Sequence, residues 1–81
     1  MARVFVYVLE SQADGSRYVG ISSRLQRRVR EHNGGHCRST AAKSPWRLVY
    51  RELCADHGSA REREKFLKSG AGREWLAGQL G

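Results

Sequence analysis

The stretch YVGISSRLQRRVREH, residues 18–32, joins a β-type run to a basic segment through a glycine. Ser23 followed three residues later by Gln26 is a capping-box pattern, which marks the start of a helix. Asn33-Gly34-Gly35 is a strong stop signal at its other end. The stretch therefore predicts a strand, a tight connection and a helix from about Arg24 to His32.

One face of this predicted helix is only half apolar. Positions at the i, i+3, i+4 and i+7 spacing share a face, and here they are Leu25, Arg28, Val29 and His32. A charged group beside a core needs a partner or an anionic ligand. Arg28 and His32, one turn apart, are therefore candidates for function.

Hydrophobic runs on either side of the stretch predict a small sheet. Val4–Leu9 is apolar on both faces, which is typical of a covered central strand. A turn at Asp14-Gly15 joins it to a second strand at Arg17–Ile21. Trp46–Leu53 alternates as a third strand. We expect the basic segment 35–45 to be an irregular loop.

The carboxyl-terminal part predicts two helices. Ser59 with Glu62 forms a second capping box, and Ala60–Ser69 is a helix closed by Gly70. A last helix covers about Arg73–Leu80, and its side chains on the core are Trp75, Leu76 and Leu80. The fold class is α/β (α+β) in the order ββαβαα, and we expect residues 1–81 to form one domain.

The charge of the chain indicates a nucleic-acid partner. Its 81 residues include 15 Lys and Arg against 8 Asp and Glu, for a formal net charge of +7 and a pI near 10.3. The sequence has no apolar run long enough for a membrane span or a leader, so we expect a cytoplasmic protein. Cys37 and Cys54 fit free thiols in that compartment.

Three further residues join Arg28 and His32 as candidates. Glu64 lies on the flank of the apolar face of its helix. The alternative to a functional role is that Glu64 forms an ion pair with Arg28 and ties the two helices together. Tyr7 and Tyr18 lie on paired strands, where a tyrosine is often only a strand aromatic. All five side chains can meet on one side of a three-stranded sheet.

These residues resemble the GIY-YIG nuclease superfamily, most closely its small stand-alone bacterial members, the YhbQ-like proteins. The similarity covers nearly the whole chain and consists of FVYVLES (5–11), YVGISSRLQRRVREHNGG (18–35), PWRLVY (45–50) and SAREREKFLKSGAGREWL (59–76). The resemblance implies the GIY-YIG fold, a three-stranded antiparallel sheet flanked by helices. It also implies metal-dependent hydrolysis of DNA phosphodiester bonds by an endonuclease.

By motif, the resemblance assigns catalytic roles to Tyr7, Tyr18, Arg28, His32 and Glu64. Glu64 would bind a single Mg²⁺ or Mn²⁺, which polarises the scissile phosphate. Arg28 would stabilise the charge that develops on the phosphate oxygens. We expect Tyr18 to act as the general base and Tyr7 to orient water or phosphate, with the reversed assignment open and His32 as proton relay.

Seven residues are expected to contact nucleic acid, and they are Gly20, Arg24, Arg27, Arg38, Ser39, Thr40 and Lys43. Contacts to the phosphate backbone position a nucleic acid without reading its sequence. We expect DNA as the substrate, with RNA left open, in repair or recombination. We expect no DNA-binding module beside this domain, and therefore weak specificity unless a homodimer or a protein partner supplies it.

Departures from the family pattern favour an alternative. Phe5 replaces the glycine of the first signature, and Ile21 follows Gly20 where some repair enzymes of the family carry a basic residue. Asn33 is the only asparagine, so the downstream asparagine that some nucleases of the family use is missing. The alternative function is a non-catalytic nucleic-acid-binding module that retains the GIY-YIG fold.

Two further hypotheses, a zinc site and an interaction surface, use different residues. A zinc site could be built from His36, Cys37, Cys54 and His57, although this set lacks the paired Cys-x-x-Cys spacing of zinc modules. An interaction surface could use Trp46 and Trp75, although tryptophans in so small a domain are more often part of the core.

Overall fold

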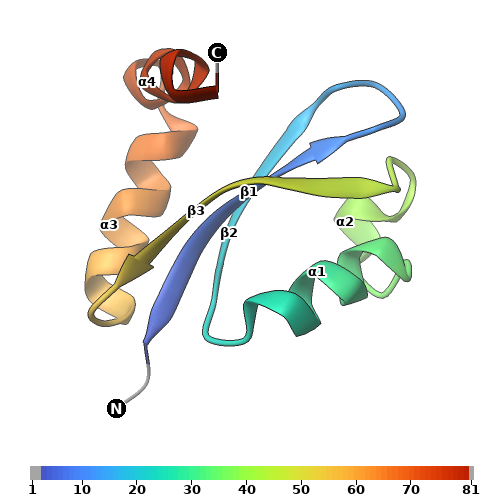
Figure 1. Ribbon diagram of the computed structural model, residues 1–81, viewed down its shortest axis with the longest axis horizontal. Coiled ribbons are helices and arrows are strands. Elements are labelled where there is room, and N and C mark those ends of the chain that lie inside the picture. The colour runs from blue at the N-terminus through green and yellow to red at the C-terminus, as the bar shows by residue number, and fades with distance from the viewer. Residues whose placement is uncertain (1–2, 81) are drawn as a thin grey trace.

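The protein is built around a three-stranded antiparallel sheet in the order β2-β1-β3 (Figure 1). The computed structural model describes residues 3–80. Strand β1 spans Val4–Ser11, β2 spans Arg17–Ser22 and β3 spans Trp46–Cys54. The predicted central position of the first strand is confirmed.

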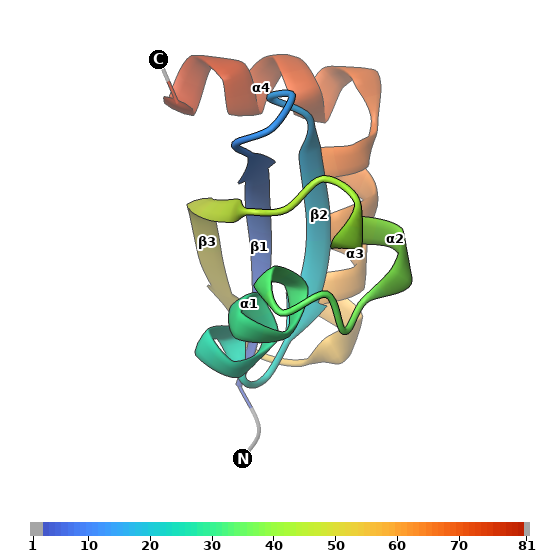
Figure 2. The ribbon, with the colours of Figure 1, turned by 90° about the vertical axis from the view of Figure 1, so that its right-hand side faces the viewer.

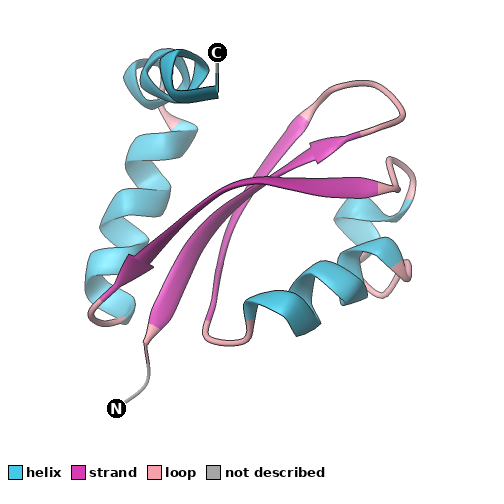
Figure 3. Ribbon diagram, viewed as in Figure 1, coloured by secondary structure: helices cyan, strands magenta, loops and turns pink. Residues whose placement is uncertain are grey.

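Helices cover both faces of this sheet (Figures 1 and 2). Helices α1 (Leu25–Asn33) and α2 (Arg38–Ala41) lie on one side, and α3 (His57–Lys68) and α4 (Gly70–Leu80) lie on the other, as Figure 3 shows. The predicted fold class is confirmed. Within residues 3–80, no helix has the length and apolar character that crossing a membrane requires.

The prediction of an irregular loop over 35–45 was wrong, because this segment contains α2. The Cys37 carbonyl accepts hydrogen bonds from the backbone N–H groups of Thr40 (3.1 Å) and Ala41 (3.0 Å). The Thr40 side chain is only 1% exposed. A four-residue helix is not stable alone, so α2 depends on contacts with distant residues that its own sequence does not reveal. The element order is therefore ββααβαα.

Neither predicted capping box forms. At α1 the N-cap residue is Arg24, without a side-chain cap, and the Ser22 hydroxyl accepts from the Arg24 N–H at 3.0 Å. At α3 the cap is Asp56, whose carboxylate accepts from the Ser59 N–H at 2.8 Å. Asp56 is as good a cap as Ser59, so the earlier of two competing signals sets the start of α3.

The corner between α3 and α4 also differs from the prediction. Helix α3 ends at Lys68, and Gly70 begins α4 instead of closing α3. The Ser69 hydroxyl accepts from the Gly72 N–H at 3.1 Å, which helps to fix the first turn of α4. The last helix therefore begins three residues before the predicted Arg73.

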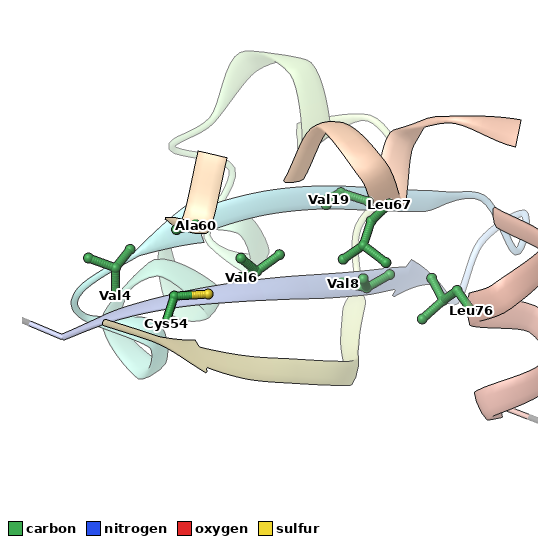
Figure 4. Close-up of a cluster of buried hydrophobic side chains, with 8 residues drawn as sticks. All are labelled: Val4, Val6, Val8, Val19, Cys54, Ala60, Leu67 and Leu76. Carbon is green, nitrogen blue, oxygen red and sulfur yellow. The ribbon is translucent and has the colours of Figure 1, made fainter. Parts of the chain in front are cut away.

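Alternation along β1 creates two apolar clusters, one on each face of the sheet. Figure 4 shows the first cluster, where β1 packs against α3 and α4, and its buried members are Val4, Val6, Val8, Val19, Cys54, Ala60, Leu67 and Leu76. The second cluster lies under α1, and its buried members are Tyr7, Leu9, Leu25 and Trp46. Trp75, Leu76 and Leu80 pack on the first cluster as predicted.

Candidate active site

The ring of Tyr7 lies across Gly20 on the α1 side of the sheet. The two residues are partners in the β1–β2 register. A Cβ atom built on Gly20 would lie 2.7 Å from the Tyr7 hydroxyl oxygen and 3.0 Å from the Tyr18 ring. Gly20 is itself buried, so its lack of a side chain makes room for the tyrosines. This position contradicts the predicted contact of Gly20 with nucleic acid.

A chain of buried hydrogen bonds starts at Tyr7. The Tyr7 hydroxyl lies 3.0 Å from His32 Nε2, and His32 Nδ1 lies 2.8 Å from Thr40 Oγ1. The Thr40 hydroxyl in turn donates to the Cys37 carbonyl at 3.3 Å. Tyr7 and Thr40 are each 1% exposed, and His32 is fully buried.

This chain favours one tautomer of His32. Because the Thr40 hydroxyl donates to the Cys37 carbonyl, its lone pair is left to accept the Nδ1–H of His32. Nε2 then accepts the hydroxyl proton of Tyr7. Burial, and after it the charge of Arg28, lowers the pKa of His32, which favours the neutral ring that this pattern requires.

Arg28 adds a positive charge beside the two rings. Its Nη1 atom donates to Glu31 Oε1 at 3.0 Å, and this hydrogen bond raises the pKa of Arg28. Burial, reinforced by the nearby Tyr18, raises the pKa of Tyr7 to about 12, although the Arg28 guanidinium acts in the opposite direction. The neutral phenol is therefore the resting form of Tyr7.

Tyr18 is the more accessible of the two tyrosines. It is partly exposed, and its ring centroid lies 4.8 Å from that of His32, 6.3 Å from that of Tyr7 and 6.4 Å from that of Trp46. These contacts bring Tyr7, Tyr18 and His32 into one cluster, with Arg28 at its border. Within residues 3–80, no protein group hydrogen-bonds the Tyr18 hydroxyl, which leaves it available to a ligand.

Glu64 lies on α3, on the other side of the sheet from Arg28 and His32 (Figure 1), so the expectation that all five side chains meet on one side of the sheet was wrong. Its side chain is 19% exposed, and Oε2 accepts from Lys68 Nζ at 3.0 Å. The alternative explanation of Glu64, an ion pair with Arg28, is wrong, because Arg28 pairs with Glu31 and Glu64 pairs with Lys68. Lys68 and Tyr18 line one groove, so the ion-pair partner of Glu64 and the accessible tyrosine face the same space.

Glu64 is suited to hold a divalent cation as a single protein ligand. Magnesium often takes only one or two protein carboxylates together with waters and phosphate oxygens. Within residues 3–80, no group of three or more His, Cys, Asp or Glu side chains is placed to hold a metal ion. This finding contradicts the zinc hypothesis, and both Cys37 and Cys54 are free thiols.

The residues predicted to contact phosphates divide by exposure. Arg24, Arg27, Arg38, Ser39 and Lys43 are exposed. Arg27 pairs with Glu31 at 3.1 Å, and Lys43 pairs with Asp14 at 3.6 Å. The buried Thr40 cannot reach a phosphate, so that prediction was wrong.

The sequence interpretation missed Asn33, Trp46 and Glu31 as residues that hold the site together. The Asn33 side chain bonds both the N–H and the carbonyl of Trp46, and the Trp46 ring N–H donates to the Thr40 carbonyl at 2.7 Å. These bonds tie α1, β3 and α2 together around His32. Glu31 was detectable, because it lies four residues after Arg27 and three after Arg28, at the spacing of helix ion pairs.

The chain has relatives with the same fold. A family model described as the GIY-YIG catalytic domain matches residues 3–74. A UPF0213 protein of Desulfotalea psychrophila is 42% identical over 66 residues, which cover 79% of this chain and 59% of that protein. A UPF0213 protein of Haloquadratum walsbyi is 38% identical over 66 residues, covering 80% of this chain and 73% of that protein.

A solved structure agrees with these sequence matches. The solution NMR structure of a UPF0213 protein from Bacillus halodurans is similar with a TM-score of 0.59 at 30% identity. The similarity covers 98% of this chain and 86% of that structure. The chain therefore spans less than two thirds of the Desulfotalea protein but most of the Bacillus structure.

Proposed function

This chain belongs to the GIY-YIG family, and from that membership we propose that it is a metal-dependent endonuclease that hydrolyses DNA phosphodiester bonds with low sequence specificity. The observation that carries the proposal is the buried hydrogen-bond chain from Tyr7 through His32 to Thr40, beside Tyr18 and Arg28. If this space served only packing, apolar side chains would fill it without the free-energy cost of burying polar groups. The arrangement therefore supports proton handling at a reaction centre.

The two tyrosines take different roles in this proposal. Tyr18, which is partly exposed, first gives its hydroxyl proton to solvent, and the phenolate then accepts a proton from water as that water attacks phosphorus. Tyr7 donates its own proton to His32, and because Tyr7 is buried, its hydroxyl orients water only once substrate binding exposes it. The phosphorus–oxygen bond to the leaving strand breaks, and the leaving oxygen takes up a proton from bulk water.

The charged residues complete the proposed site. Arg28 donates hydrogen bonds to the non-bridging oxygens, whose negative charge grows in the transition state. Glu64 would hold Mg²⁺ or Mn²⁺, which when bound polarises the phosphate and stabilises the leaving oxygen. Metal binding at Glu64 requires its carboxylate to turn from Lys68, and that exposed ion pair is weak.

The direct test is removal of the metal. We expect the purified protein to nick supercoiled plasmid with Mg²⁺ or Mn²⁺ and to stop when EDTA is added. We also expect EDTA to leave the unfolding temperature unchanged, because the described residues form no structural metal cluster. A protein that binds DNA but never cuts it would instead be a binding module.

Thr40 has a positioning role in this proposal. Its hydroxyl accepts the Nδ1–H of His32 at 2.8 Å, while its carbonyl is fixed by the Trp46 ring at 2.7 Å. Thr40 thereby holds His32 in the tautomer whose Nε2 accepts from Tyr7. It acts through His32 and does not touch the substrate.

We expect Thr40→Val to lose about tenfold or more in cleavage, whereas Thr40→Ser retains most of it. Valine has nearly the same shape but leaves the buried Nδ1–H without an acceptor, at a cost of about 1–3 kcal/mol in the free energy of unfolding. Nitrogen chemical shifts of the imidazole report the tautomer directly. If Thr40→Val left both the His32 tautomer and cleavage unchanged, this role would be refuted.

A further inference from the structure

An open groove of about 570 Å³ runs between β2 and the corner of α3 and α4. Its apolar lining comes from Val19, Leu67 and Leu76, which belong to the core cluster of Figure 4, and Tyr18 forms part of its wall. The groove therefore reaches from the core to the proposed general base.

Three basic side chains line the same groove. They are Arg17 from β2, Lys68 from the end of α3 and Arg73 from α4. Arg17 is 3.6 Å from Glu10, and Lys68 is paired with Glu64. Arg73 has no ion-pair partner within residues 3–80. The groove thus combines an apolar floor with excess positive charge, a combination that suits a nucleotide.

A second basic hollow lies at the other end of β2. It is lined by Ser22, Arg24, Arg27 and Arg28 at the start of α1. The first groove adjoins Arg17, the first residue of β2, and the second adjoins Ser22, the last. Since β2 is an edge strand, its outer backbone groups are unpaired with another strand. The two hollows therefore mark a basic path along this edge.

We propose that the groove between β2 and the α3–α4 corner binds one nucleotide of a single nucleic-acid strand, next to the phosphate at Tyr18. This inference rests on the proposed function for the role of Tyr18. The base lies over the floor of the groove, where Val19 is 9% exposed and Leu67 and Leu76 are buried beneath it, and Arg17 and Arg73 contact the phosphates. The volume is in the range of about 300–1,000 Å³ typical of small-ligand sites, which is enough for a nucleotide.

The test is equilibrium binding of a fluorescent oligothymidylate, followed by anisotropy in EDTA so that cleavage plays no part. We expect the double variant Arg17→Ala/Arg73→Ala to bind about tenfold more weakly than the parent. Its salt dependence, the slope of log K against log salt, should fall by about 1.4 if two phosphate contacts are lost. We expect matched duplex to bind the parent more weakly than the single strand.

The matched control is Arg61→Ala/Lys65→Ala, which removes the same charge from exposed positions of α3 outside the groove. We expect this variant to bind within about twofold of the parent, since it loses only long-range attraction. Unfolding curves establish that both double variants are folded.

The possible results separate this inference from the proposed function. If both double variants bind equally, or if duplex is preferred with the same loss, the groove assignment is wrong even where the parent cuts DNA. If the parent never cuts DNA but only the groove variant loses binding, the groove assignment stands and the nuclease proposal fails. Oligothymidylate should also shift the methyl NMR signals of Val19, Leu67 and Leu76, and unchanged signals would place the base elsewhere.

Discussion

Replacing Glu64 by alanine is expected to lower metal-dependent cleavage by at least about 100-fold, the scale at which loss of one transition-state contact is felt. Glu64 is the only carboxylate that the proposed mechanism uses as a metal ligand. The fold should tolerate the change, because the lost ion pair with the exposed Lys68 contributes about 0.5 kcal/mol or less. The prediction therefore separates chemistry from stability in a single substitution.

The measurement compares initial nicking rates at several Mn²⁺ concentrations, together with Mn²⁺-induced NMR line broadening around residue 64. Glu62→Ala is the matched control, because Glu62 is an exposed glutamate one half-turn away on α3. It should retain cleavage within about twofold. Lys68→Ala tests whether the loss of cleavage in Glu64→Ala arises because Lys68 loses its ion-pair partner. If Glu64→Ala cut DNA and bound Mn²⁺ as the parent does, the assignment of Glu64 would be lost.

Much of the fold follows from hydrophobic alternation in the sequence. Val4–Leu9 is apolar on both faces, and only a strand covered from both sides makes use of such a pattern. Helix ends were less predictable because several residues can cap one helix. Asp56 and Ser59 are equally good caps by type, and the choice depends on how the chain leaves β3.

The site was predictable where strand pairing places residues together. Tyr7 and Tyr18 lie on adjacent strands and face the same side of the sheet, so their meeting follows from the register. Thr40 was not predictable, because its contact with His32 requires the turn of α2 to be buried. Helical spacing also could not reveal whether Glu64 would reach Arg28, because α1 and α3 lie on opposite sides of the sheet.

Replacing Gly72 by alanine is expected to destabilise the protein by about 3 kcal/mol or more, at the upper end of the cost of overpacking. A Cβ atom on Gly72 would overlap the Phe66 carbonyl oxygen and lie 2.7 Å from the Leu67 Cα atom. These are backbone atoms of α3, and they cannot rotate away. The corner between α3 and α4 must therefore open, which separates the buried Leu67 from Leu76.

Gly78→Ala is the matched control on the same helix, because a Cβ atom there meets nothing within 4 Å. Alanine is the better helix former, so this variant should gain about 0.5–1 kcal/mol. Urea denaturation measures both changes, and equal stabilities for the two variants would contradict the close packing at Gly72.

Because Lys68, Arg73 and Leu76 line the groove at this corner, a Gly72→Ala protein that still folds should also bind oligothymidylate more weakly. Gly78→Ala should leave that binding unchanged, because the geometry of the corner, more than the helicity of α4, holds the groove in shape.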